Sequence, residues 1–445
     1  MSLQKMWNFG KTNCPCKRSH TFTLSQAVIE KDAIDKLPNC MIEGGYQKAF
    51  LLADLHTFSV AGEKVCAVLE KGSIPYEKYV FPTGYVEPDE SAVGSAVMHF
   101  DKSCDLVISI GSGVMNDIGK IIASIASLPY FIVATAPSMD GYASASSSMT
   151  VDGVKVSLPS KCPDVIIGDI EILKNAPLKM LQAGFGDMLA KYISIAEWRI
   201  AHEITGEYYC ERVDELIREA LRQCVDNAEG LLNRNEEAVK AVFEGLVIGG
   251  AAMSFAKVSR PASGVEHYIS HIWDMRSLEF GTKSELHGIQ CAVATTVVAG
   301  LYEKLLEISP DQETALEYVN SFSYNEWSKT LKSFVGKGAD TMIELENKER
   351  KYDLASHRKR LDTIIEKWDT ICEIIRKEIP KRKEIEAILR SIGAPKLPQD
   401  IGLADDFKTT FSATKDIRDK YVLSRLLWDI GRIDELCSNM DSEQA

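Results

Sequence analysis

The chain of 445 residues is too long for one compact core, so we expect two domains. Hydrophobic residues make up 45% of it and charged residues 26%, which is typical of a globular protein. A net charge of -13 argues against a nucleic-acid partner, because an acidic surface repels phosphate backbones. No continuous apolar run is long enough for a membrane span or a signal peptide, so we expect a cytoplasmic protein without a membrane partner.

The first 170 residues alternate short apolar runs with helical stretches. The runs are bounded by turn residues, as are parallel strands that are buried on both faces. Strands that alternate with helices predict a doubly wound α/β layer. The predicted strands are residues 48–54, 64–70, 78–81, 105–110 and 129–135, and residues 148–159 form a predicted hairpin that turns at Asp152 and Gly153.

From residue 171 onward the pattern changes to long helical periods without convincing strands. Apolar residues recur every three or four positions over 361–379, which predicts one helix face, and a further helix ends before Gly393 and Pro395. We therefore predict an α/β dinucleotide-binding domain at residues 1–170, followed by an all-α domain at residues 171–445. The active site is expected in a cleft between these domains.

Residues 105–120, DLVISIGSGVMNDIGK, have the pattern of a strand, a glycine turn and a helix start. Gly111 and Gly113 permit a tight turn and a close approach of the backbone to phosphate. The helix that begins near Val114 offers N–H groups to a pyrophosphate. Asn116 stands where the third glycine of the G-x-G-x-x-G motif would be, so a purely structural glycine turn is the alternative.

Two further strand ends carry polar residues that suit a nucleotide. Asp54 ends the first strand, where its carboxylate can accept hydrogen bonds from an adenosine ribose or, alternatively, cap the following helix. The loop ATAPSMDGYAS, residues 134–144, supplies the hydroxyls of Thr135, Ser138 and Ser144. Open α/β sheets bind ligands at the carboxyl ends of their strands, so the three features support one another.

The helical half contains a set of residues suited to a catalytic metal. Asp187, His267 and His287 supply one carboxylate and two imidazoles, which leaves a coordination position open. His271 follows His267 by four residues and shares its helix face. Any single histidine is more often an imidazole satisfied by hydrogen bonds, but three within 21 residues favour a site.

The eleven cysteines contain no C-x-x-C pair, and Cys14 and Cys16 are the only two that lie close in sequence. The other nine are scattered singly, many in apolar stretches, so we interpret them as small buried hydrophobic residues. A metal or redox role for Cys14 and Cys16 is the alternative for that pair.

Five motifs in this order resemble sn-glycerol-1-phosphate dehydrogenases: GSGVMND, TAPSMDGYAS, GFGDMLAKY, SRPASGVEHYISH and LHG. This family belongs to a superfamily that includes iron-containing alcohol dehydrogenases, glycerol dehydrogenases and dehydroquinate synthases. The resemblance covers most of the chain, and the C-terminal stretches IGAPKLPQDIGL and IRDKYVLSRLLWDIG are similar to the bacterial branch. It implies a dehydroquinate synthase-like fold, with a Rossmann-like sheet followed by a helical metal-binding domain.

The resemblance also implies roles for individual residues. Asp187, His267 and His287 would hold one divalent metal, nickel or zinc rather than iron. Asp140 and His271 would contact the substrate and take part in catalysis, with Asp187 bordering it. Asp54 would contact the adenosine ribose of NAD(H) or NADP(H). The remaining cofactor contacts would be Gly113, Val114, Met115, Asn116, Asp117, Thr135, Ala136, Pro137, Ser138 and Ser144.

One residue departs from the iron-dependent alcohol dehydrogenases. Lys191 stands four residues after Asp187, where those enzymes have a third histidine ligand. Lys191 and Lys283 are candidates for binding a substrate phosphate. The resemblance implies reduction of dihydroxyacetone phosphate to sn-glycerol 1-phosphate by a homodimer. A glycerol dehydrogenase, a dehydroquinate synthase-like cyclase and a non-catalytic NAD-binding regulator are the alternatives.

Overall fold

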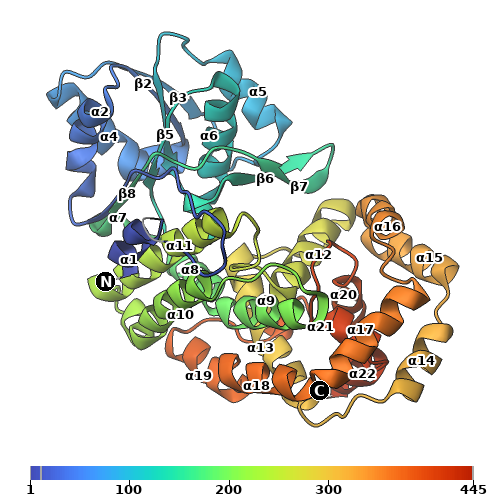
Figure 1. Cartoon of the computed structure of the whole chain (residues 1–445). Helices are drawn as coiled ribbons and strands as arrows, with labels where there is room; N and C mark the ends of the chain where they lie inside the picture. Colours follow the sequence, from blue (N-terminus) through green and yellow to red (C-terminus); the bar gives the residue numbers. More distant parts are fainter. Residues whose placement is uncertain (1, 11–12, 443–445) are drawn as a thin grey trace. The chain divides into compact units, whose positions relative to one another are not determined.

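The computed structural model describes residues 2–10 and 13–442 and divides into two compact units (Figure 1). The first unit comprises Met1–Met188, Arg212–Ser259 and Ser391–Gly393. The second comprises Leu189–Glu211, Arg260–Arg390 and Ala394–Ala445. The change from strands to helices falls near the predicted boundary, because the last strand ends at Asp169. The compact units nevertheless do not follow this boundary, since later helices belong to the first unit.

A parallel sheet of six strands forms the centre of the first unit, in the order β1-β8-β5-β4-β2-β3. The predicted doubly wound fold is confirmed. The strands are β1 (Gln26–Glu30), β2 (Ala49–Asp54), β3 (Tyr76–Phe81), β4 (Leu106–Gly111), β5 (Tyr130–Ala134) and β8 (Val165–Asp169), and the predicted hairpin is β6 (Ser146–Val151) with β7 (Val154–Pro159).

The direction of winding reverses between β2 and β4. From β2 the chain moves outward to β3, and it then returns to place β4 on the other side of β2. Such a topological switch point leaves a crevice at the carboxyl ends of the two strands, where dinucleotides bind in folds of this type. Asp54 ends β2 and Gly111 ends β4, so both predicted nucleotide residues lie at this point.

Helices cover both faces of the sheet. On one face, Leu37 and Met41 of α2 and Val65 of α4 pack against Leu51 and Ile108 of the strands. On the other face lies α6. Figure 1 shows α2 and α4 on one side of the strands and α5 and α6 on the other. The helices of this unit are α1 (Ser2–Phe9), α2 (Leu37–Gly44), α3 (Leu55–Thr57), α4 (Glu63–Lys71), α5 (Glu90–Met98), α6 (Gly113–Ala126), α7 (Ile170–Leu173), α8 (Leu178–Leu189), α10 (Glu211–Asp226) and α11 (Glu236–Ala256).

The predicted strand at 64–70 is wrong, since these residues form α4. Val65, Cys66 and Leu69 are buried while Glu63, Ala67 and Glu70 are exposed, which is the three-and-four spacing of a helix. Two strands were also missed. The first, β1, is short and carries polar residues at both ends, and β8 follows the hairpin without a helix between them.

Helix α11 is long and apolar enough to cross a membrane by length and composition, with a mean hydropathy of 1.5 over its most apolar window. It contains Lys240 and Glu244, and 72% of that window is buried inside the protein. A Cβ atom on Gly168 at the end of the sheet would lie 2.3 Å from the ring of Phe243 in this helix. We therefore interpret α11 as a core helix of the first unit.

The second unit consists of helices and loops over its described residues. One of its cores gathers Ile272, Leu331, Phe334, Met342 and Ala413. The single helix predicted over 361–379 is wrong, because Lys367 separates two helices that share one apolar face. The helices are α9 (Lys191–Thr205), α12 (Val265–Phe280), α13 (His287–Leu305), α14 (Gln312–Asn320), α15 (Tyr324–Val335), α16 (Gly338–Glu349), α17 (Leu354–Glu366), α18 (Trp368–Glu378), α19 (Arg382–Ser391), α20 (Phe407–Ala413), α21 (Leu423–Asp429) and α22 (Ile433–Ser442).

Candidate active site

The glycine turn after β4 leads directly into α6. A Cβ atom on Gly111 would lie 2.5 Å from Cβ of Met115, so the turn has room only for glycine. The N-cap residue Ser112 makes no side-chain hydrogen bond to the first turn. Residues Gly113–Asp117, which were predicted to contact the cofactor, form this first turn. Its backbone N–H groups and the dipole of α6 favour the binding of an anion such as a pyrophosphate.

Helix α6 also approaches the sheet closely. A Cβ atom on Gly119 would lie 1.9 Å from Oγ of Ser109 in β4, so a larger residue would push the helix away. In dinucleotide-binding folds a glycine performs this packing role. Sequence reasoning missed Gly119, because it lies three residues beyond the position where the motif would place it.

Asp54 caps the short helix α3. Its Oδ1 accepts a hydrogen bond of 2.8 Å from the backbone N–H of Thr57, and its own N–H donates to Thr57 Oγ1 at 3.0 Å. The alternative of a helix cap is thus confirmed. A carboxylate has about four acceptor sites, so capping is compatible with a ribose contact as well.

The loop after β5 is fastened by a buried lysine that the sequence did not point to. Lys120 Nζ donates to the carbonyl of Gly141, to Ser144 Oγ at 3.0 Å and to the carbonyl of Ser146 at 3.2 Å. Burial lowers the pKa of Lys120, while the nearby carboxyl of Asp117 opposes this shift. The hydroxyl of Ser144 is therefore part of the network that shapes the loop.

Hydrogen bonds also hold the start of this loop, directly after β5. The N–H of Thr135 donates to the carbonyl of Gly111 at 3.0 Å, which ties the ends of β5 and β4 together. Tyr142 donates its hydroxyl proton to the carbonyl of Ala136 at 2.6 Å. The N–H of Ser138 donates to the same carbonyl at 3.1 Å. Residues 135–138, which were predicted to contact the cofactor, are thus held beside the glycine turn.

Two helices of the first unit, α8 and α11, pack closely against this loop. A Cβ atom on Gly184 in α8 would lie 1.8 Å from the carbonyl oxygen of Pro137. One on Gly250 in α11 would lie 2.8 Å from the carbonyl oxygen of Asp140. The N–H of Asp140 donates to Oδ2 of Asp187 at 2.8 Å, and Asp187 is fully buried in α8. The loop therefore positions Asp140 directly beside the predicted metal-binding carboxylate.

In the second unit, α12 and α13 bring the predicted histidines together. The ring centroids of His267 and His287 lie 5.0 Å apart, and those of His271 and His287 lie 5.7 Å apart. The thiol of Cys291, one turn after His287, lies within 4.8 Å of a ring nitrogen of both His267 and His287. Sequence reasoning missed Cys291, which was counted among the buried cysteines.

Each of the two imidazoles is oriented through its Nδ1 atom. His267 Nδ1 lies 2.7 Å from Oε1 of Glu266, a carboxylate that can only accept a proton from it. Ser270 donates to Gln290 Oε1 at 2.6 Å, so its oxygen accepts from His287 Nδ1 at 2.9 Å. Both rings are thereby fixed in the tautomer that leaves Nε2 as an acceptor, which is how metal-binding histidines are held.

A buried carboxyl supports this arrangement. Glu197 accepts hydrogen bonds of 2.8 Å from the N–H groups of Val265 and Leu423. Burial raises the pKa of Glu197, and the negative charge of Glu266 raises it further. Burial thus favours the neutral form of Glu197, which lies beside the residue that orients His267.

Several known proteins are similar to this chain. The family model of iron-containing alcohol dehydrogenases matches residues 28–177. A glycerol-1-phosphate dehydrogenase (NAD(P)+) of Halalkalibacterium halodurans is 29% identical over 401 residues, which cover 89% of this chain and 90% of the relative. One from Geobacillus thermodenitrificans is 32% identical over 295 residues, which cover 65% and 73%. This chain belongs to the glycerol-1-phosphate dehydrogenase family.

The fold of this family member is shared with more distant structures. A probable glycerol dehydrogenase from Sinorhizobium meliloti 1021 superposes with a TM-score of 0.59 at 17% identity, covering 95% of this chain and 99% of that one. This match supports the predicted fold class of an α/β sheet followed by a helical region.

The two lysines suggested for phosphate binding in this dehydrogenase family member lie in different surroundings. Lys191 is fully buried, and its Nζ donates to the carbonyl of Ala262 at 3.1 Å. Lys283 is exposed, and its Nζ would lie 2.8 Å from a Cβ atom on Gly402. Lys191 therefore anchors the SRPASG segment, and its role toward phosphate stays a prediction.

A third lysine has surroundings that suit an anion better. Lys420 Nζ donates to the carbonyl of Ser263 at 2.9 Å and lies 5.5 Å from the ring centroid of Tyr268. Burial, with the positive charges of Arg260 and Arg418, lowers the pKa of Lys420 to about 7. The carboxylates of Glu266 and Glu207 oppose this shift, and Arg260 pairs with Glu207 at 2.6 Å. Lys420 is therefore a further candidate for binding a phosphate.

Proposed function

We propose that this chain catalyses the reversible NAD(P)H-dependent reduction of dihydroxyacetone phosphate to sn-glycerol 1-phosphate, with one divalent metal. Family membership supports the reaction. The observation that carries the proposal is the pair His267 and His287, each with Nδ1 hydrogen-bonded and Nε2 left as an acceptor. Two imidazoles prepared in this way are typical of a catalytic metal centre.

The metal ligands in this proposal are Asp187, His267 and His287. The donor set fits a divalent metal, because imidazole nitrogen and carboxylate oxygen suit zinc, nickel and iron(II) alike. We favour nickel or zinc, since Lys191 stands where iron-dependent relatives have a further histidine. When bound, the metal supplies Lewis-acid polarisation of a carbonyl oxygen.

The nucleotide in this proposal binds at the switch point of the sheet. The first turn of α6, Gly113–Asp117, would receive the pyrophosphate, and the loop residues 135–138 with Ser144 would line the same crevice. Asp54 would accept hydrogen bonds from the adenosine ribose, which favours NAD(H) over NADP(H). Burial raises the pKa of Asp117 to about 6, so its carboxyl is still largely ionised at neutral pH.

The substrate in this proposal is held by Asp140 and His271. Asp140 would accept a hydrogen bond from a substrate hydroxyl, because its N–H fixes it beside Asp187. His271 stacks on His287 at a centroid distance of 5.7 Å and can exchange a proton with the substrate oxygen. We assign the phosphate group to the cations around Lys420. A homodimer in the cytoplasm stays a prediction of the sequence.

The test compares two ketones that differ only in the phosphate. The rate of NADH oxidation is measured with dihydroxyacetone phosphate and with dihydroxyacetone. We expect kcat/KM to be at least 100-fold higher for the phosphorylated ketone, which corresponds to about 2.7 kcal/mol of transition-state stabilisation. The product should be oxidised in reverse as sn-glycerol 1-phosphate and not as its enantiomer. Equal activity on both ketones would instead indicate a glycerol dehydrogenase.

A further inference from the structure

A thiol lies among the imidazoles of the proposed catalytic centre. Cys291 and His287 are four residues apart in α13, so they share one face of this helix. His267 approaches them from α12, with its ring centroid 5.0 Å from that of His287. The ligand atoms of His267, His287 and Cys291 all lie within 4.8 Å of one another. All three residues belong to the second unit, so this group is complete within one compact body.

The thiol contacts a ring nitrogen that a metal would bind. Glu266 and Ser270 engage the Nδ1 atoms of the two rings, which leaves each Nε2 as an acceptor. Sγ of Cys291 lies 3.6 Å from Nε2 of His287. A thiol carries a single proton, so it can donate to one of the two imidazoles at a time. Two imidazoles and one sulfur atom gathered this closely therefore suit one cation better than one shared proton.

The spacing of these atoms also fits direct coordination. Zinc bonds are about 2.3 Å long to sulfur and about 2.0 Å long to nitrogen, and a tetrahedral angle then places the two ligand atoms about 3.5 Å apart. The separation of Cys291 Sγ and His287 Nε2 is 3.6 Å. Cys291 is fully buried in a helix, so close packing limits the freedom of its side chain to turn away.

We propose that Cys291 is a further ligand of the catalytic metal and makes the centre prefer zinc to magnesium and manganese. The inference rests on the metal centre of the proposed function, to which it adds a third protein ligand from the second unit. Thiolate is a soft ligand that favours zinc, whereas magnesium and manganese prefer oxygen ligands. The thiol gives up its proton to solvent when it binds. Catalytic zinc can take a fifth ligand, so a position remains for the substrate.

The first experiment needs no variant. The full wild-type chain is loaded with one zinc ion, and X-ray absorption at the zinc edge measures the atoms bound to it. We expect one sulfur atom at about 2.3 Å among nitrogen and oxygen atoms at about 2.0 Å. A zinc ion bound by nitrogen and oxygen alone would overturn the role of Cys291 and leave the proposed function intact.

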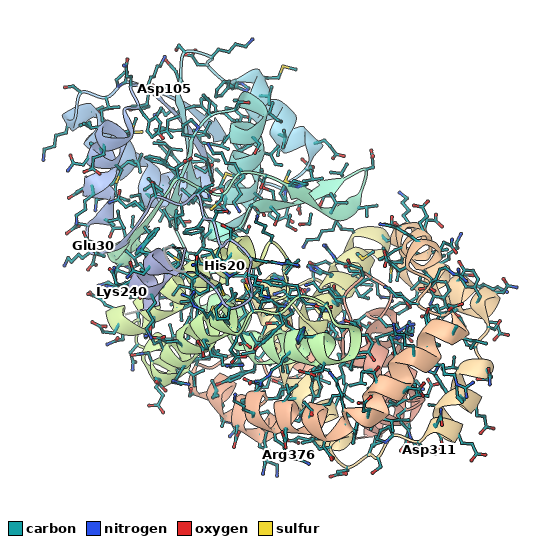
Figure 2. All side chains as sticks on the ribbon, in the orientation of Figure 1. His20, Glu30, Asp105, Lys240, Asp311 and Arg376 are labelled. Carbon is teal, nitrogen blue, oxygen red and sulfur yellow. The ribbon has the colours of Figure 1, made fainter. Side chains whose placement is uncertain are left out.

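The second experiment assigns the sulfur atom to Cys291. Cobalt(II) is bound in place of zinc, and the near-ultraviolet band that arises when thiolate binds cobalt is recorded. The band should disappear in Cys291→Ser while one cobalt ion stays bound, whereas His267→Ala should lose both the band and the ion. The matched control is Cys372→Ser, which should keep the band. Cys372 is also a buried thiol of the second unit, and it lies in α18 one turn before Arg376, which Figure 2 labels.

The third experiment compares metal affinities in the wild type and in Cys291→Ser. Zinc should bind at least tenfold more weakly in the variant, whereas the Kd of manganese should change less than twofold, because serine replaces a soft ligand by a hard one. An unchanged cobalt band, or equal changes in affinity for both metals, would overturn the proposal, and Cys291 would then be a buried hydrogen-bond donor to the imidazole. Metal bound equally well by the wild type and His267→Ala would overturn the proposed metal centre itself, and the role of Cys291 with it.

Discussion

Replacing Gly184 by alanine should damage the nucleotide loop at one defined point. The new Cβ atom would lie 1.8 Å from the carbonyl oxygen of Pro137 and 2.7 Å from its carbonyl carbon. Ordinary van der Waals contact begins near 3.4 Å, so helix and loop must separate by roughly 1.5 Å. The atoms met are backbone atoms, and the loop that contains them is fastened by Lys120 and by Tyr142. Relaxation therefore breaks existing hydrogen bonds.

The expected magnitude follows from two opposing terms. Glycine to alanine inside a helix stabilises by about 0.5 to 1 kcal/mol, whereas overpacking a rigid core costs about 1 to 3 kcal/mol. We expect a net loss of about 1 to 2 kcal/mol in the free energy of unfolding, because the clash is more severe than one added methyl group usually causes. The displaced loop should also weaken NADH binding by at least tenfold.

Gly94→Ala is the matched control, because Gly94 is also helical and a Cβ atom there meets nothing within 4 Å. This variant should gain about 0.5 to 1 kcal/mol in the free energy of unfolding and bind NADH normally. Urea unfolding followed by circular dichroism gives the stability, and quenching of tryptophan fluorescence by NADH gives the affinity. If both variants unfold alike and bind NADH alike, the contact between α8 and the loop does not shape the nucleotide site.

Three further predictions concern the site itself. His267→Ala and His287→Ala should each lose the catalytic metal, and kcat should fall at least 1000-fold. His271→Ala should lower kcat but keep that metal, which elemental analysis would measure. Loss of metal in His271→Ala alone would reverse these assignments. Asp54→Asn should lower the ratio of kcat/KM with NADH to kcat/KM with NADPH. A wild-type enzyme that prefers NADPH would contradict the role of Asp54. Lys420 loses its charge as the pH rises through about 7. The KM for dihydroxyacetone phosphate should therefore rise between pH 7 and 9, while the KM for dihydroxyacetone stays level. In Lys420→Met the two KM values should respond alike to pH.

The sequence predicted the sheet well where strands are apolar and isolated by turns. It failed at 64–70 because a short apolar run fits either a buried strand or a helix, and only the tertiary packing of Val65 and Leu69 decides between them. It merged α17 and α18 into one helix for a related reason. Both helices bury the same side, so the apolar spacing continues across Lys367 although the helix does not.

The sequence indicates candidate site residues where a motif carries them, and it gives no signal where tertiary structure assembles them. The glycine turn, the loop after β5 and the histidines on α12 and α13 are each contained in one short stretch of sequence. Lys120 and Glu197 have no such signal, because their importance comes from the carbonyl and N–H groups that the fold brings to them.

Helix α12 carries more of the proposed metal centre than its one ligand suggests. His267 takes its orienting partner, Glu266, from the adjacent position, and Ser270, one turn later, orients His287 on α13. The separation of the two imidazoles, 5.0 Å between ring centroids, is therefore set by the packing of two buried helices and not by a loop. Rigid helices hold ligand positions more precisely than loops do, and metal affinity and catalysis both depend on that precision.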